Sequence, residues 1–296
     1  DLVAWIRAED AGTIDADLAA LAAPLGLPEA AAPEEHRRIR AVREWLESHD
    51  HWLLVFDNVV EPRTIRSYLP RNGAGHVLIT SRHQSWHELA RSVDVDVPRE
   101  DEAVQLLLDR SGSDDADAAR DLASLLGRLP LALEEAAAYA HATGRTLREY
   151  ASLFREQQGR LLAANPPSAD YPATLRTTWQ MSLQQLSAEE PASVDLLAIL
   201  AHLAPERVPR FLFLPPRGAD DGADASPARD EAALDRQLAA LLRYSLVRVE
   251  DDEIFVHRLL QAVLRDRPSV HERAALADRT LRLVERAFPQ SGSAGR

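Results

Sequence analysis

The sequence predicts an α/β unit built on a parallel sheet, then an all-helical unit, then a second helical unit that contains a small hairpin. Three observations support this fold class. Short apolar runs alternate with helical patterns over the first hundred residues, which is typical of a parallel sheet covered by helices. From about Arg99 onward, amphipathic helical patterns replace the strands. Near the C-terminus, two short strand-like runs flank Asp251-Asp252, which indicates a hairpin.

The first unit, residues 1–98, is expected to contain four strands and two helices. The helix before the second strand has Ile39, Val42 and Leu46 at the spacings of one apolar helical face. The run VDVDV alternates like a half-exposed strand. Strands are expected at Leu2–Ile6, Trp52–Phe56, His76–Thr80 and Val93–Val97, and helices at Thr13–Ala23 and Glu34–Ser48.

The second unit, residues 99–162, is expected to be all-helical. Gly127 stands where one helix would end in the left-handed region, and Pro130 stands where the next would begin. Residues 163–172 contain three prolines in the run AANPPSADYP and are expected to form a linker. Helices are expected at 100–110, 115–126, 130–143 and 146–158.

The third unit, residues 173–290, is expected to be a winged helix, because several helices are followed by a small hairpin and then by further helices from Arg258. The polar run 215–230 is expected to be its least ordered segment. Helices are expected at 173–186, 191–203 and 230–243, and hairpin strands at 245–250 and 253–256.

Composition excludes several kinds of chemistry. The 296 residues include no cysteine, so there is no disulfide and no thiolate ligand or nucleophile. They include no lysine either, so no Schiff base and no phosphate-binding lysine can come from them. A net charge of −13 argues against broad nucleic-acid binding. No apolar run reaches the length of a membrane span and no signal peptide is recognisable, so the expected location is cytoplasmic.

Polar residues follow two of the expected strands. Asp57-Asn58 follows the second strand, and Thr80, Ser81 and Arg82 end the third. Ligands of parallel α/β sheets bind beyond the carboxyl ends of the strands, and carboxylate oxygens suit Mg²⁺. The sequence therefore predicts a phosphate and magnesium site at this edge. The simpler interpretation is that Asp57 and Asn58 cap the next turn and that Arg82 lies in an exposed loop.

Four motifs, taken in order, resemble the NB-ARC domain of STAND-class P-loop ATPases (AP-ATPase/NLR-like), especially bacterial members followed by tetratricopeptide repeats. They are WLLVFDN, GHVLITSR, LGRLPLALEEAAAY and IFVHRLLQAVLRD, and the resemblance covers Asp1 to about Asp266. It implies an α/β P-loop subdomain followed by helical and winged-helix subdomains. It also implies ATP or ADP as the bound nucleotide, with Mg²⁺.

The resemblance implies roles for the strand-end residues. Asp57 matches the Walker B aspartate that positions Mg²⁺. Arg82, in the motif that includes Thr80, matches the sensor arginine that responds to the γ-phosphate. Where many family members carry a second acid, this sequence has Asn58, which can orient a water but cannot take its proton. The activity implied is therefore at most slow hydrolysis of a nucleoside triphosphate.

Three further residues match family motifs in the helical part. Gly127 and Pro130 match the GLPL motif, whose proline packs near the adenine. His257 matches the histidine of the MHD-type motif, which contacts the β-phosphate of ADP and locks the resting state. The simpler interpretation of His257 is a structural histidine after a short strand.

No G-x-x-x-x-G-K-[ST] motif occurs in the sequence, and RNGAGH lacks both its spacing and its lysine. The P-loop and its strand are therefore expected upstream of residue 1. In the family, that strand lies between those matched by 52–56 and 76–80. We accordingly expect a gap in the sheet, with residues 1–98 weakly folded, rearranged or completed by another segment.

These expectations together describe a nucleotide-dependent signalling switch. The winged helix would clamp the ADP state, and the output would come from flanking domains such as C-terminal repeats that bind protein partners, with homo-oligomers forming on activation. Two alternatives stay open. One is a winged-helix transcription regulator that binds DNA. The other is a protein-interaction scaffold that binds no nucleotide.

Overall fold

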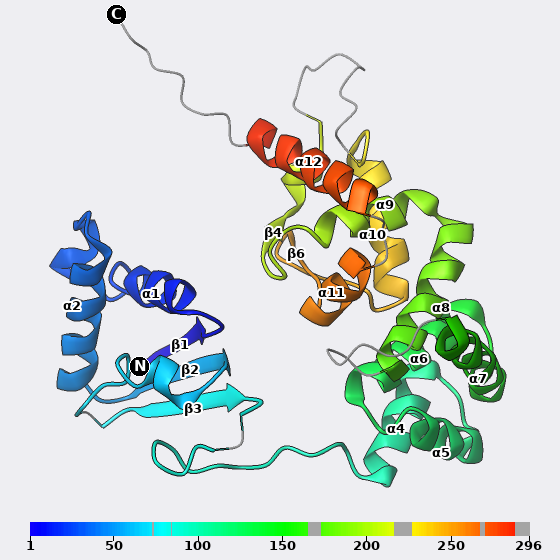
Figure 1. The fold of residues 1–296 in the computed structure, drawn as a ribbon, viewed down its shortest axis with the longest axis horizontal. Coiled ribbons are helices and arrows are strands. Elements are labelled where there is room, and N and C mark those ends of the chain that lie inside the picture. Colours follow the sequence, from blue (N-terminus) through cyan, green and yellow to red (C-terminus); the bar gives the residue numbers. More distant parts are fainter. Residues whose placement is uncertain (73, 84, 165–172, 216–226, 267–269, 288–296) are drawn as a thin grey trace, which may run out of the picture. The chain divides into compact units, whose positions relative to one another are not determined.

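The computed structural model describes residues 1–72, 74–83, 85–164, 173–215, 227–266 and 270–287. The chain divides between Val95 and Asp96 into two units (Figure 1). Each unit has its own hydrophobic core. None of the helices in these ranges is long and apolar enough to cross a membrane.

The first unit is a three-stranded parallel sheet with strand order β1-β2-β3. The carboxylate of Asp10 accepts a hydrogen bond from the backbone N–H of Thr13, so helix α1 starts earlier than the sequence pattern indicates. The elements are β1 (Leu2–Arg7), α1 (Ala11–Ala20), a 3₁₀ turn η1 (Pro28–Ala31), α2 (Glu35–Ser48), β2 (Trp52–Val59), α3 (Pro62–Ile65) and β3 (His76–Ser81).

Helices α1 and α2 cover one face of this sheet. Ile6, Leu54 and Phe56 are fully buried in the same core as apolar residues of the two helices. Val3 and Trp5 alternate with these positions along β1 and stay 75% and 58% exposed. The opposite face of the sheet is therefore open at β1.

Two expectations about the first unit are wrong. The expected gap between the second and third strands is absent, because β2 pairs directly with β3 from Leu53 opposite His76 onward. Direct pairing satisfies backbone groups that a gap would leave unpaired. The run Val93–Val97 is not a strand but irregular chain. Val93 and Val95 are 79% and 94% exposed, and an alternating pattern forms no strand without a neighbour to pair with.

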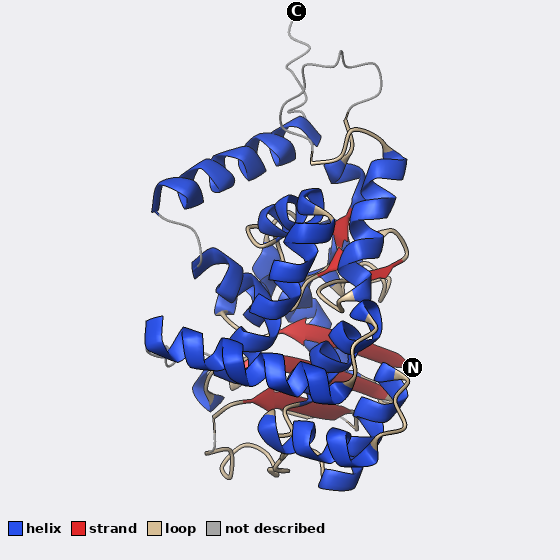
Figure 2. Cartoon of the chain, turned by 90° about the vertical axis from the view of Figure 1, so that its right-hand side faces the viewer, coloured by secondary structure: helices blue, strands red, loops and turns tan. Residues whose placement is uncertain are grey.

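The second unit is mainly helical, with one small sheet (Figure 2). All the expected helices form, although the one expected at 191–203 ends at Leu200. The elements are α4 (Glu100–Ser111), α5 (Ala116–Leu125), α6 (Pro130–Thr143), α7 (Leu147–Ala164), α8 (Ala173–Glu189), α9 (Pro191–Leu200), β4 (Val208–Pro209), a 3₁₀ turn η2 (Arg210–Phe213), α10 (Glu231–Arg243), β5 (Arg248–Glu250), β6 (Glu253–Phe255), α11 (Arg258–Asp266) and α12 (Val270–Ala287).

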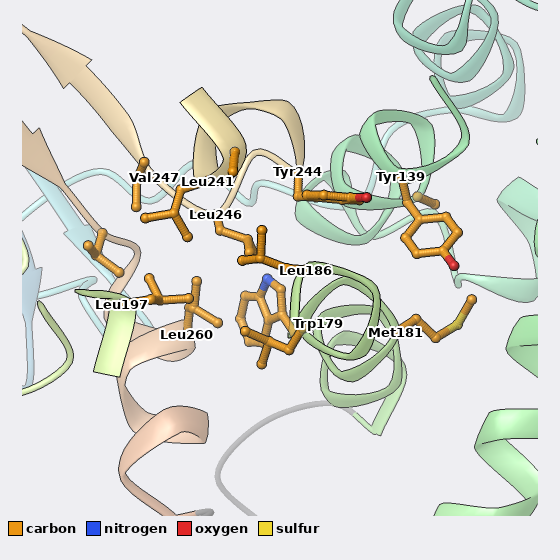
Figure 3. Close-up of a cluster of buried hydrophobic side chains, with 14 of the residues drawn as sticks. Tyr139, Trp179, Met181, Leu186, Leu197, Leu241, Tyr244, Leu246, Val247 and Leu260 are labelled. Atoms are coloured by element: carbon orange, nitrogen blue, oxygen red, sulfur yellow. The ribbon is translucent and has the colours of Figure 1, made fainter. Parts of the chain in front are cut away.

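Helix α8 joins two groups of helices in this unit, one formed by α4 to α7 and the other by α9 to α12. It packs on α6 and α7 on one side and on α9 on the other (Figure 1). Its Trp179 is fully buried and lies among Leu186, Leu246 and Leu260 (Figure 3). One continuous core therefore runs through both groups.

The small sheet is antiparallel, with strand order β4-β6-β5. The hairpin β5–β6 turns at Asp251 and Asp252, which both have positive φ. The two-residue strand β4, which pairs Val208 with Ile254, was not expected from the sequence, because two residues carry no periodic signal.

Two expected loops lie largely outside the described residues. The start of the expected linker 163–172 belongs to α7, and residues 165–172 are not described. Of the expected loop 215–230, residues 216–226 are not described.

The turn between α5 and α6 has the predicted chemistry. Gly127 has a φ of 64°, and the N–H of Arg128 donates to the carbonyl of Ala123 at 2.9 Å, which closes the end of α5. Pro130 is the first residue of α6, where its missing N–H costs nothing. The motif thus has a complete structural explanation as a helix-to-helix joint.

We predict that Gly127→Ala lowers the free energy of unfolding of the second unit by about 1 kcal/mol, because an L side chain is strained at positive φ. A Cβ there would meet no atom within 4 Å, so the loss reflects backbone conformation rather than a clash. Urea unfolding followed by circular dichroism measures it. Gly127→Asn is the matched control and should lose less, because Asn tolerates the left-handed region. Equal losses for Ala and Asn would contradict this explanation.

Candidate functional site

The ends of β2 and β3 bring Asp57, Asn58 and Thr80 together. The hydroxyl of Thr80 donates to Oδ1 of Asp57 at 2.5 Å and accepts from the backbone N–H of Asn58 at 2.8 Å. One side chain on β3 thus fixes both the carboxylate and the backbone of the neighbouring strand. The sequence placed these residues at the same edge of the sheet but gave no sign of their hydrogen bonds.

Asn58 has an unusual backbone. Its φ is 60°, and the register between β2 and β3 shifts between Phe56 and Val59. Strand β2 therefore continues through Asp57 and Asn58 to Val59 instead of ending before them. Asparagine tolerates positive φ better than most residues do. The simpler interpretation, in which this pair caps the next turn, does not describe α3, because the residue at its N-cap is Glu61 and no side chain caps that helix.

The residues at this edge suit a magnesium ion only in part. Asp57 is half-buried and Thr80 is exposed, so one carboxylate and one hydroxyl face the edge. The described residues contain no group of three or more His, Cys, Asp or Glu side chains that could hold a metal. Mg²⁺ is commonly held by one or two carboxylates together with nucleotide phosphates and waters. Asp57 therefore fits Mg²⁺ as a companion of a bound nucleotide and not as an independent metal site. Arg82 follows β3 and is exposed.

The second unit contains a cleft of about 650 Å³ between its two groups of helices. Leu131 and Glu134 line it from α6, and Ser245, Arg248 and His257 line it from the part that holds the small sheet. Charges of both signs are present, beside apolar side chains.

His257 lies between β6 and α11. Its Nδ1 accepts a hydrogen bond from the N–H of Leu259 at 3.2 Å, so the neutral ring carries its proton on Nε2. The ring centroid is 6.4 Å from that of Trp179, with 42° between the planes. Burial lowers the pKa of His257 from its ordinary value of 6.5.

A polar contact joins the two walls of the cleft. The guanidinium of Arg110 pairs with the carboxylate of Glu134, with one N–O distance of 2.9 Å. The hydroxyl of Ser245 donates to the same carboxylate at 3.3 Å. Ser245 has a φ of 54°, just after α10. We call Arg110, Glu134 and Ser245 the latch.

Gly127 and Pro130 are exposed and lie at the start of α6. They do not line the cleft themselves, but the helix that they begin supplies Leu131 and Glu134 to it. Gly127, Pro130 and His257 thus all belong to the second unit, and of the three only His257 lines the cleft. Asp57, Asn58, Thr80 and Arg82 belong to the first unit.

Sequence reasoning missed two residues beside the cleft, Glu135 and Trp179. Glu135 is 1% exposed, and burial raises its pKa to about 8. A signal was present, because Glu135 lies between Ala132 and Tyr139 on the buried face of α6, where an acid is out of place. Nothing in the sequence distinguishes Trp179 from the other apolar residues of its helix.

Comparison with known proteins supports the resemblance at a coarse level. Residues 181–273 match a family described as a domain of unknown function (DUF7779). Over 97% of its length the chain is 23% identical to a nucleotide-binding leucine-rich repeat (NLR)-like protein from Hyaloscypha variabilis, and it spans 31% of that relative.

Solved structures show a shared fold. The crystal structure of a signal transduction ATPase with numerous domains (STAND) that carries a tetratricopeptide repeat sensor, from Pyrococcus horikoshii, overlaps 96% of this chain with a TM-score of 0.56 and 15% identity. This chain spans 39% of that structure. A Walker-type ATPase of Pyrococcus abyssi overlaps with a TM-score of only 0.34, too low to indicate a common fold. The chain therefore has a STAND-like fold.

We predict that His257 titrates below 6.5 and is neutral at pH 7, because burial opposes its charge. The unfolded chain then binds the proton more tightly than the folded one, so stability falls as the pH drops below 6.5. NMR titration of the ring measures the pKa, and His257→Gln identifies its signal. A midpoint at or above 6.5 would show that the ring is not buried as described.

Proposed function

We propose that residues 1–296 form the ATP/ADP-binding regulatory switch of a STAND-type signalling protein. The observation that carries the proposal is similarity along 97% of the chain to a nucleotide-binding NLR-like protein. The STAND-like fold and the four sequence motifs support it.

In this proposal the strand ends of the first unit face the nucleotide phosphates. Asp57, oriented by the hydroxyl of Thr80, would hold Mg²⁺, and Arg82 would contact the γ-phosphate. The ion would neutralise phosphate charge. Asn58 offers an amide where a general base would be needed, so turnover is slow. The phosphate-binding loop itself is proposed to precede residue 1.

The second unit would supply the lock. Its small sheet and the helices around it are proposed to be a winged helix, with His257 at the cleft. The Nε2–H of His257 would donate to the β-phosphate of ADP, and the joint at Gly127 and Pro130 would place α6 near the adenine. ADP would then favour the arrangement in which His257 contacts the nucleotide, and ATP would favour another, because each nucleotide binds one arrangement more tightly.

Output is proposed to come from flanking segments. The Pyrococcus horikoshii protein carries a tetratricopeptide repeat sensor, and an array of this kind after residue 296 would bind protein partners. Homo-oligomer formation on release of ADP would complete the switch.

The test uses the whole protein that carries these residues. We predict that it copurifies with ADP, that Asp57→Asn abolishes the Mg²⁺ dependence of nucleotide binding, and that His257→Ala weakens ADP binding about tenfold through loss of one hydrogen bond to a charged group. Chromatography of the nucleotide released on denaturation and calorimetric titration with ADP measure these effects. His271→Ala, an exposed histidine on α12, is the matched control and should change neither.

Other results would favour the alternatives. A whole protein that neither copurifies with nucleotide nor binds ADP would be a scaffold. Salt-dependent binding to duplex DNA in the absence of nucleotide binding would identify a transcription regulator.

A further inference from the structure

Glu135 is an acid within the hydrophobic core of the second unit. Its side chain is 1% exposed, and burial raises its pKa to about 8. An isolated carboxylate in an apolar core is costly, whereas the uncharged acid is tolerated. The geometry therefore favours the protonated acid at neutral pH.

Three helices contribute polar groups to the surroundings of Glu135. Trp179 of α8 presents its indole N–H beside the carboxyl and opposes the effect of burial on its pKa. The other two groups are the hydroxyl of Tyr150 on α7 and the carboxylate of Glu134, which precedes Glu135 on α6. Among the described residues, Oε2 of Glu135, the hydroxyl of Tyr150 and Nε1 of Trp179 have no hydrogen-bond partner within ordinary geometry. These groups are close to one another without being locked together.

Trp179 connects this cluster to the cleft. Its ring is fully buried, and it lies 6.4 Å from the ring of His257. Glu135 also lines the cleft, together with His257. A path of contacts therefore runs from α6 through α8 to the histidine that follows β6.

We propose that Glu135 is a positioning residue for the indole of Trp179 beside His257, and that ionisation of Glu135 draws the indole N–H towards the carboxylate and so displaces Trp179 and His257 at the cleft. This inference deepens the proposed function, because it concerns how His257 is positioned. It rests on that function only in taking the cleft to be the place where His257 contacts ADP.

The surrounding charges fix the sign of the effect. Glu134, the nearest acid, disfavours a second negative charge and already pairs with Arg110 of α4. Tyr150 stays protonated, because burial raises its pKa, and His257 is neutral at pH 7. The folded state thus binds the proton of Glu135 more tightly than the unfolded state does. The contribution to stability is complete below the ordinary value of 4.5 and falls as the pH rises towards about 8.

The experiment follows Trp179 directly in the whole chain. The chain has five tryptophans, and labelling with 5-fluorotryptophan gives each a fluorine NMR signal. Trp179→Phe assigns the signal of Trp179. We expect this signal to titrate with a midpoint near 8 in the wild type and to stay constant in Glu135→Gln, which keeps the shape but cannot ionise. Asp121→Asn removes an exposed carboxylate of α5 and should leave the titration unchanged.

A second readout reports on His257. In the wild type, the ring signal of His257 should change with the same midpoint as the signal of Trp179, and in Glu135→Gln it should stay constant around that pH. A Trp179 signal that does not move between about pH 6 and about pH 10, or that titrates equally in Glu135→Gln, overturns the proposal. ADP binding is measured separately. A protein that binds no ADP but shows the Glu135-dependent titration supports the inference while contradicting the proposed function.

Discussion

The burial of helix α8 between two groups of helices is the constraint on which the second unit depends. Trp179 is fully buried at the point where α6, the turn after α10 and α11 meet. A large indole at such a point makes many weak contacts, and removing it would leave a cavity that neighbours cannot fill. The relative placement of the helical segment and the small sheet therefore follows from this packing more than from surface ion pairs.

Two adjacent acids on α6 show how environment decides role. Glu134 reaches the cleft and forms the latch with Arg110 and Ser245, in a partly exposed setting where such contacts are worth little individually. Glu135 turns into the core, where the same chemical group resists ionisation. The charged Glu134 thus pairs with Arg110 and accepts the hydrogen bond of Ser245 from the other wall, and its neighbour Glu135 is compatible with the packing only without charge.

In the first unit, the parallel pairing of β2 with β3 determines which residues meet at the strand ends where the phosphate site is proposed. The contact between Thr80 and Asp57 exists because β2 and β3 are neighbours, and the register that pairs Phe56 with Ile79 sets the next residue of each strand close together. The face of the sheet that carries Val3 and Trp5 is open at β1, in contrast to the face covered by α1 and α2.

The sequence by itself determined the elements, because apolar periodicity and turn chemistry are local. The helices of the second unit and the Gly127–Pro130 joint followed from it, as did three of the four strands expected in the first unit and both strands of the hairpin. The STAND-like fold followed from motif order and is matched by the shared fold. Tertiary structure alone decided which strands pair, since VDVDV found no neighbour and β2 closed directly on β3. It alone placed Glu135 beside Trp179 and His257, because contacts between residues far apart in the chain leave no local trace in their periodicity.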